Sequence, residues 1–172
     1  MIRKAEEKDL QAAAALYEDT HDAEEKGLTT TGWIRGVYPT GDTARQAWQN
    51  GELFVEEDGE LVGAAIINQK QVDVYASALW RYDAPDQEVM ALHTLVISPK
   101  AKGRGYGREF VHFYEQYARS RNCHYLRMDT NVRNQRARLL YRKLGYQEIG
   151  IVPTVFNGIE GVELVLLEKK LG

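Results

Sequence analysis

The most informative segment of the chain is Lys102-Gly103-Arg104-Gly105-Tyr106-Gly107-Arg108. It follows an apolar run, Ala91 to Ile97, that predicts a strand, and it leads into Glu109 to Ala118, which predicts a helix. Glycines at alternate positions let the backbone take conformations that other residues resist and approach a ligand closely. Because the unpaired N–H groups and the dipole at a helix start attract anions, the segment predicts a cradle for a phosphate or pyrophosphate group.

The composition predicts a single globular domain over residues 1–172. Apolar residues make up 44% of the chain and charged residues 27%, and the formal net charge of −3 offers no basic footprint for nucleic acid. The lone cysteine, Cys123, excludes an internal disulfide and a cysteine-based metal cluster, so we predict no metal and a reducing compartment. The longest apolar run, Leu61 to Ile67, is too short to span a membrane, and the N-terminus lacks the apolar segment of a signal peptide. We therefore expect a cytoplasmic protein with neither a nucleic-acid nor a membrane partner.

The remaining periodicities predict a mixed sheet flanked by helices, an α/β chain with α+β character. Asp58-Gly59 predicts the turn of a hairpin, and Ala23 to Gly41 predicts a short helix with a mobile, partly buried loop. Further helices are predicted at Lys8 to Thr20, Thr43 to Asn50 and Asn134 to Leu144. Strands are predicted at Ile2 to Ala5, Leu53 to Glu57, Glu60 to Gln69, Val72 to Tyr75, Met90 to Ile97, Tyr125 to Asp129, Tyr146 to Val152 and Val162 to Glu168.

A second motif begins at Asn134 and reads Asn134-Gln135-Arg136-Ala137-Arg138-Leu139-Leu140-Tyr141, with Gly145-Tyr146 after it. Asn134 and Tyr141 are seven residues apart, which places them on one helix face. This motif and the stretch from Leu95 to Gly107 resemble the two cofactor motifs of the GNAT superfamily of acetyl-CoA-dependent N-acetyltransferases, with Lys102 where Gln or Arg is usual. The resemblance runs from Ile2 to about the last strand, and it implies the GNAT acyl-CoA N-acyltransferase fold with a mostly antiparallel central sheet.

The resemblance implies acetyl-CoA as the co-substrate. In the family, backbone N–H groups of the glycine segment hold the pyrophosphate, the preceding strand pairs with the pantetheine arm, and an Asn and a Tyr complete the site. Because Lys102 lacks the planar fork of Arg, we expect the backbone to bear most of the pyrophosphate contacts. The matching cofactor residues of this chain are Leu95, Val96, Ile97, Lys102, Gly103, Arg104, Gly105, Tyr106, Gly107, Arg108, Asn134 and Tyr141.

The resemblance also implies that a neutral amine attacks the thioester directly and forms a tetrahedral oxyanion. In the family, a backbone N–H at a strand bulge stabilises this oxyanion, and the position matches Leu95. Tyr141 matches the general acid that protonates the departing thiolate. The family's Glu base falls on Ala91, so we expect His93 to replace it, on the strand face shared by Ala91 and Leu95. The alternative is a structural histidine bonded to the backbone.

Asp129 admits two roles from the sequence. With Thr130 and Asn131 it either ends a strand and caps the following loop or belongs to an active site. The ribose-binding role of a dinucleotide fold is disfavoured, because Arg108 stands where a third glycine would be needed. For the acceptor, a group of aromatic residues predicts either a pocket or core packing: Trp33, Tyr38, Tyr75, Trp80 and Tyr82.

These features predict an N-acetyltransferase that moves the acetyl group of acetyl-CoA to a primary amine of a small molecule or peptide. One alternative is a non-catalytic acyl-CoA-binding sensor or partner module, because a cofactor cradle does not guarantee chemistry. Another is a transferase that uses longer acyl groups. The terminal strands, Tyr146 to Val152 and Val162 to Glu168, also suggest a homodimer in which they pair between two chains.

Overall fold

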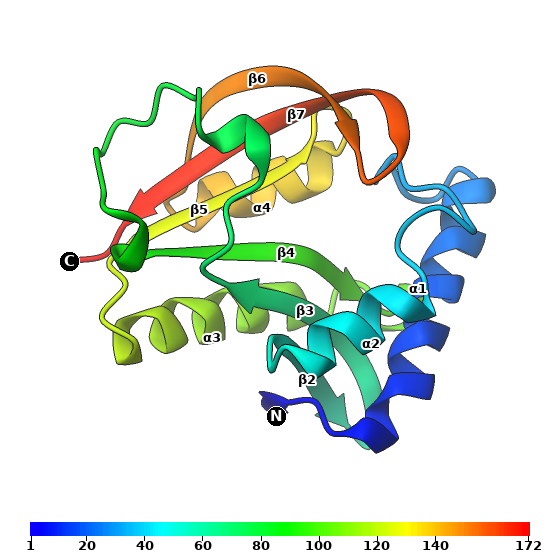
Figure 1. Cartoon of the computed structure of the whole chain (residues 1–172). Coiled ribbons are helices and arrows are strands. Elements are labelled where there is room, and N and C mark those ends of the chain that lie inside the picture. The colour runs from blue at the N-terminus through cyan, green and yellow to red at the C-terminus, as the bar shows by residue number, and fades with distance from the viewer.

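The fold is a seven-stranded sheet flanked by helices, and the computed structural model describes every residue from Met1 to Gly172 (Figure 1). The strand order is β1-β2-β3-β4-β5-β7-β6, and all neighbours are antiparallel except β4 and β5. This arrangement confirms the predicted fold class. The strands are β1 Ile2–Lys4, β2 Leu53–Asp58, β3 Glu60–Asn68, β4 Val89–Ile97, β5 Tyr125–Asn131, β6 Gln147–Phe156 and β7 Ile159–Lys170. The helices are α1 Leu10–Glu25, α2 Gly41–Gln49, α3 Tyr106–Ser120 and α4 Gln135–Lys143.

Two apolar layers cover the two faces of the sheet. On one face, α3 and α4 pack Phe110, Tyr114 and Tyr141 against β4 and β5. On the other face, α1 and α2 pack Leu16 and Ala47 against β2 and β3 (Figure 1). Tyr114 also donates its hydroxyl to the carbonyl of Met90 at 2.6 Å. Because burial of a large apolar side chain contributes about 1.5–3 kcal/mol, these layers hold β4 and β5 firmly in place.

None of the helices has the length and apolar character that a membrane crossing requires.

The predicted hairpin of β2 and β3 is confirmed. Asp58 pairs with Glu60 across the turn, and Gly59 between them has φ of +77°. A side chain at this position would be strained in the left-handed region, so glycine is the residue that the turn requires.

β4 and β5 separate halfway along their length, and this divergence positions the site. They pair in parallel only from Val89 to Leu92 of β4. Beyond that point β4 contains a bulge, because Thr94 and Leu95 lie opposite the single residue Ala65 of β3, and Thr94 has φ of +50°. A bulge bends its strand and leaves backbone groups outside the ladder. The C-terminal halves of β4 and β5 therefore frame an opening in the middle of the sheet.

Residues 69–88, which we call the strap, link β3 to β4 and cross the face of β5 and β7. The strand predicted at Val72 to Tyr75 is wrong, because this segment forms a 3₁₀ turn at Asp73–Tyr75. Its side chains pack on Leu166 and other residues of β7 instead of pairing beside another strand. Arg127 of β5 and Glu168 of β7, both buried, hold the strap through hydrogen bonds.

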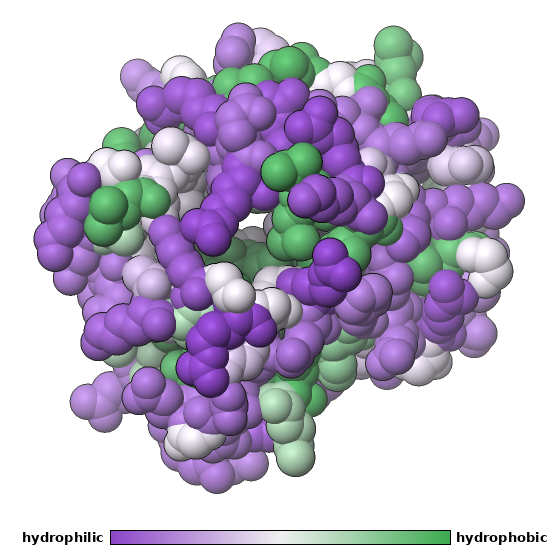
Figure 2. All heavy atoms as spheres, turned by 180° about the vertical axis from the view of Figure 1, so that it is seen from behind, coloured by the Kyte–Doolittle hydropathy of each residue, from purple (hydrophilic) through white to green (hydrophobic).

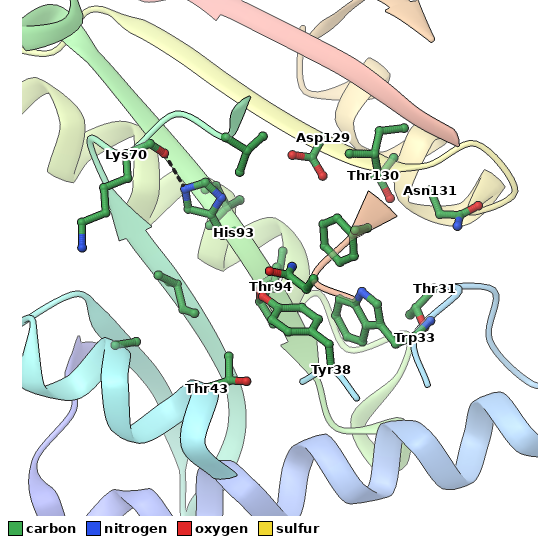
Figure 3. A pocket seen from close by; sticks show the side chains of 18 of the residues that line it. Thr31, Trp33, Tyr38, Thr43, Lys70, His93, Thr94, Asp129, Thr130 and Asn131 are labelled. Atoms are coloured by element: carbon green, nitrogen blue, oxygen red, sulfur yellow. Dashed lines mark hydrogen bonds between the residues drawn. The ribbon is translucent and has the colours of Figure 1, made fainter. Parts of the chain in front are cut away.

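The segment between α1 and α2 also differs from the prediction. The short helix expected within Ala23 to Gly41 is absent as a separate element, because α1 continues to Glu25 and the chain then runs as a loop to α2. Gly27, Gly32 and Gly36 each have φ between +72° and +77°, which interrupts any helix. The loop carries Trp33 and Tyr38 toward the opening in the sheet (Figure 3).

Candidate active site

A cavity of about 730 Å³ lies where β4 and β5 separate. Its wall combines β4, β5, the strap, α2, α4, the α1–α2 loop and the β6–β7 hairpin. Four of the predicted site residues line it together: His93, Leu95, Asn134 and Tyr141. Seen from the face opposite to that of Figure 1, the surface is hollowed near its centre, with apolar atoms inside and hydrophilic side chains around the rim (Figure 2).

Leu95 occupies the bulge, as the resemblance implied, but its side chain does not share a face with that of His93. Leu95 packs with the layer under α3, which also contains Leu92, whereas Val96 packs under α1. The extra residue of the bulge inverts the alternation of side chains along β4. The expectation of one common face for Ala91, His93 and Leu95 is therefore wrong.

Tyr141 presents a free hydroxyl to the cavity. Its ring is buried and packs edge-on against Tyr146, with ring centroids 6.1 Å apart. The hydroxyl has no hydrogen-bond partner within the protein, and it is not closed off from the cavity. Burial, and then the nearby charge of Asp129, raise the pKa of Tyr141 well above its ordinary value. The phenol therefore keeps its proton at neutral pH and can donate it.

Asn134 has a structural role at the start of α4. It is the N-cap of this helix, and its Oδ1 accepts a hydrogen bond from the N–H of Ala137 at 3.3 Å. The cap positions the side chain at the cavity wall beside the first turn of α4.

The glycine cradle lies outside this cavity, at the N-terminus of α3. Gly103 and Gly105 have φ of +79° and +89°, and a Cβ on either would meet nothing within 4 Å. None of the backbone N–H groups from Gly103 to Arg108 donates to another backbone group, and no side chain caps the helix. The segment therefore presents a row of unpaired donors at the positive end of the α3 dipole, which is an environment suited to a pyrophosphate.

Two of the basic side chains of the cradle, those of Lys102 and Arg104, are directed elsewhere. Lys102 donates its Nζ to the carbonyl of Leu28 at 3.3 Å. Arg104 lies 3.5 Å from Asp58 and stacks on the ring of Tyr106, whose hydroxyl also bonds to Asp58. The side chains of the other two predicted residues on the preceding strand, Val96 and Ile97, pack in the apolar layers. The backbone, not these side chains, is what the structure offers to a ligand.

His93 is held in one tautomer by its neighbours. Its Nε2 lies 2.9 Å from Oδ1 of Asn68 and 3.0 Å from the carbonyl of Lys70 (Figure 3). Asn68 Oδ1 also accepts the backbone N–H of Lys70 at 3.0 Å, and its Nδ2 donates to Glu52 at 3.0 Å, which fixes the amide orientation. Because Nε2 faces two acceptors, it must carry the hydrogen. The lone pair of the ring is therefore on Nδ1, which has no partner and is not closed off from the cavity.

The same surroundings keep His93 neutral. Burial lowers its pKa from about 6.5, and the Lys70 carbonyl only partly opposes this effect. At pH 7 the ring is uncharged, with one nitrogen able to accept a proton. Both roles considered from the sequence, a base and a histidine bonded to the backbone, are thus compatible in one side chain.

Asp129 is the main site residue that the sequence left undecided. It lies near the end of β5 in the cavity wall (Figure 3). Its Oδ2 accepts a hydrogen bond from the hydroxyl of Tyr75 in the strap at 2.6 Å. Burial raises its pKa to about 6, and the Tyr75 hydrogen bond opposes the rise. A signal was present in the sequence: Arg127 and Asp129 alternate with the buried residues Leu126 and Met128, so two charges share one face of a strand.

Aromatic residues form one side of the cavity. Trp33, Tyr38 and Phe156 line it, and Tyr38 packs edge-on against both of the others. Phe156, at the end of β6, was not singled out from the sequence, because the hairpin that carries it reaches the cavity only in the folded chain. Tyr75, Trp80 and Tyr82 belong to the strap and lie outside the cavity wall.

Comparisons with known proteins agree with this geometry. The sequence profile of the Acetyltransferase (GNAT) family matches residues 13–146. An uncharacterized N-acetyltransferase of Methanocaldococcus jannaschii is 29% identical over 98 residues, which are 56% of this chain and 42% of that protein. The chain thus spans less than half the length of this relative.

Solved structures match the whole chain. An acetyltransferase of the GNAT family from Streptococcus agalactiae superposes with a TM-score of 0.82 at 25% identity, covering 100% of this chain and 95% of that one. A ribosomal-protein-alanine N-acetyltransferase from Brucella melitensis gives a TM-score of 0.72 at 24% identity and 99% coverage of both chains. A protein from Salmonella typhimurium, solved with its cofactor acetyl-CoA, gives 0.68 at 22% identity, covering 100% and 94%. With the profile match over most of its length, the chain belongs to the acetyltransferase (GNAT) family.

Proposed function

We propose that the protein transfers the acetyl group of acetyl-CoA to a primary amine. The observation that carries this proposal is the meeting, in one cavity, of the β4 bulge at Leu95 with the free hydroxyl of Tyr141. A hydrogen-bond donor for an oxyanion and an acid for a leaving thiolate are the two groups that acyl transfer from a thioester needs.

The cofactor site of the proposal follows the unpaired backbone donors. The N–H groups from Gly103 to Arg108 hold the pyrophosphate, and the pantetheine arm lies in the opening between β4 and β5, paired with Leu95 to Ile97 like an added strand. Asn134 and Tyr141 complete the site at the cavity. The acetyl-CoA bound to the relative from Salmonella typhimurium supports this choice of cofactor. Acetyl-CoA supplies the activated thioester, and the chain supplies positions and protons.

The transfer step forms one bond and breaks another. The amine nitrogen attacks the thioester carbon, so a C–N bond forms, and the C–S bond breaks when the tetrahedral intermediate collapses. The backbone N–H of Leu95 donates to the oxyanion, and Tyr141 gives its proton to the departing sulfur. The amine gives up a proton, because only about one lysine-like amine in a thousand is neutral at pH 7.

We assign that proton to Nδ1 of His93, and we assign the binding of the incoming ammonium group to Asp129. The position of the lone pair on Nδ1 and the neutral state of the ring support the first assignment. The carboxylate of Asp129, ionised above pH 6, supports the second. The two groups line the same cavity from β4 and β5 (Figure 3).

The test is release of the free coenzyme A thiol from acetyl-CoA with a panel of amines, amino acids, polyamines and short peptides. Turnover with one amine class, reduced in Tyr141→Phe, would support the transferase. The second candidate is a non-catalytic acyl-CoA sensor, and Ala91 favours it because it offers no carboxylate where the family places a base. Tight binding of acetyl-CoA by calorimetry without turnover of any amine would favour the sensor. Parallel assays with longer acyl-CoAs would show whether the cavity accepts larger acyl groups.

A further inference from the structure

The charges in the cavity wall indicate the class of acceptor, on the basis of the transferase proposed above. The charged side chains of the wall are Asp42, Glu52, Lys70 and Asp129. Lys70 is paired, because its Nζ lies 3.0 Å from Oε1 of Glu52. No arginine lines the cavity, and Arg133 lines the adjacent hollow beside the β6–β7 hairpin. The wall therefore has no unpaired cation, while Asp42 and Asp129 have no cationic partner.

The helix terminus in the wall does not replace the missing cation. α2 begins at the cavity, and the N-terminus of a helix normally attracts an anion. Here the capping box of Thr40 and Thr43 occupies the first turn, and Asp42 adds a negative charge to it. A substrate carboxylate at this terminus would face the like charge of Asp42, which opposes the attraction of the helix dipole.

The two unpaired carboxylates lie at different depths. Asp129 is partly buried beside Tyr75 at the divergence of β4 and β5, where the free hydroxyl of Tyr141 also opens into the cavity. Asp42 is exposed, at the start of α2. The aromatic rings of Trp33 and Tyr38 line the same cavity and offer faces or edges to a cation or its alkyl chain.

We propose that the acceptor is a small aliphatic di- or polyamine that carries no acidic group. One of its amines lies against Asp129 and receives the acetyl group, with a C–N bond formed, the C–S bond broken and the amine proton passed to His93. A second ammonium group lies at the mouth against Asp42. An α-amino acid is excluded, because its carboxylate would enter a cavity that holds two unpaired carboxylates and no free cation to pair with it.

Matched pairs of amines test this proposal with the full-length protein and acetyl-CoA. Cadaverine and lysine share the same terminal amine and differ in the α-carboxylate, and putrescine and ornithine form a second such pair. Cadaverine and pentylamine differ in the second amine alone. We expect kcat/KM for cadaverine to exceed that for lysine at least tenfold, because the α-carboxylate of lysine has no cation to pair with in the cavity. We also expect it to exceed that for pentylamine about threefold, as for an exposed ion pair.

The variant Asp42→Asn should reduce the preference for cadaverine over pentylamine, whereas Glu60→Gln, at the exposed β2–β3 hairpin, should leave it unchanged. Equal turnover of lysine and cadaverine would overturn the exclusion of acidic acceptors. Equal turnover of pentylamine and cadaverine would overturn the second ammonium site. If no amine of any kind is acetylated while acetyl-CoA binds, the transferase itself is wrong and the inference falls with it.

Discussion

Tyr141→Phe should separate catalysis from stability more cleanly than any other single change in the cavity. The tyrosine hydroxyl has no partner in the protein, so its removal leaves no donor or acceptor orphaned. The ring stays buried against Tyr146 and the layer under α3. We therefore expect the free energy of unfolding to change by no more than about 0.5 kcal/mol.

The rate should respond very differently. A positioned general acid contributes about 10²- to 10⁴-fold, and a thiolate with an ordinary pKa of about 8.5 leaves readily enough to place the effect at the lower end. A loss of about 10²-fold in kcat corresponds to about 2.7 kcal/mol of transition-state stabilisation. Thiol release measures kcat, calorimetry measures the Kd of acetyl-CoA, and a thermal scan measures Tm on the same preparation.

Tyr146→Phe is the matched control for this variant. Its hydroxyl donates to Glu115 at 3.0 Å, so its loss should cost about 1 kcal/mol and lower Tm by about 2–4 °C, with kcat retained. A Tyr141→Phe enzyme with unchanged kcat and unchanged Kd for acetyl-CoA would refute the assignment of the acid, and with it the role given to the free hydroxyl.

Three further predictions concern the pH dependence of catalysis, the glycine cradle and the pH dependence of stability. Because burial lowers the pKa of His93 from its ordinary value of about 6.5, the acid-side fall in kcat should begin below that value, where the ring takes up a proton and can no longer accept one. His93→Gln should remove this acid limb, and Asp129→Asn should raise KM for the amine. Removal of the limb by Asp129→Asn alone would reverse the two roles. Gly105→Ala places a side chain at φ of +89°, so it should cost about 1–2 kcal/mol of backbone strain and weaken acetyl-CoA binding about tenfold by calorimetry. Gly59→Ala carries similar strain at φ of +77° in the hairpin and should leave that Kd unchanged; equal weakening by both variants would contradict the cradle. Finally, burial and then the neighbouring Glu109 raise the pKa of Glu56 to about 8, so the folded state holds a proton that the unfolded chain releases near pH 4.5, and stability should fall as pH rises from 4.5 to 8. Glu56→Gln should flatten this dependence and raise stability at pH 8 by about 1–3 kcal/mol, and thermal scans at pH 6 and pH 8 that show no difference between the variant and the parent would exclude the effect.

The local parts of the fold could be predicted because their signals lie within a few residues of one another. The Asp58-Gly59 turn sets the β2–β3 hairpin, and the glycine segment after an apolar strand sets the start of α3. The seven-residue spacing of Asn134 and Tyr141 places both at the cavity. Turn chemistry and helix periodicity act locally, so the sequence alone displays them.

The parts that could not be predicted depend on pairing between distant strands. The inversion of side chains at Thr94 and Leu95 follows from the register with Ala65, which no pattern within β4 reveals. The strap lacks strand pairing because the buried charges of Arg127 and Glu168 bind its backbone instead. Asp129 lines the cavity because β5 separates from β4 beyond Met128, and its hydrogen bond with Tyr75 depends on the path of the strap.

The divergence of β4 and β5 gives the sheet a pair of interior edges. An outer edge strand exposes a row of backbone groups to any passing chain, and proteins must guard it against unwanted association. The edges at this opening lie inside the sheet, between other strands and next to the packed layers of both faces, so the cavity is the way to them. A thread-like ligand with amide groups of its own can pair with such an edge. The fold thus offers strand-like recognition inside the sheet, to a molecule that enters through the cavity.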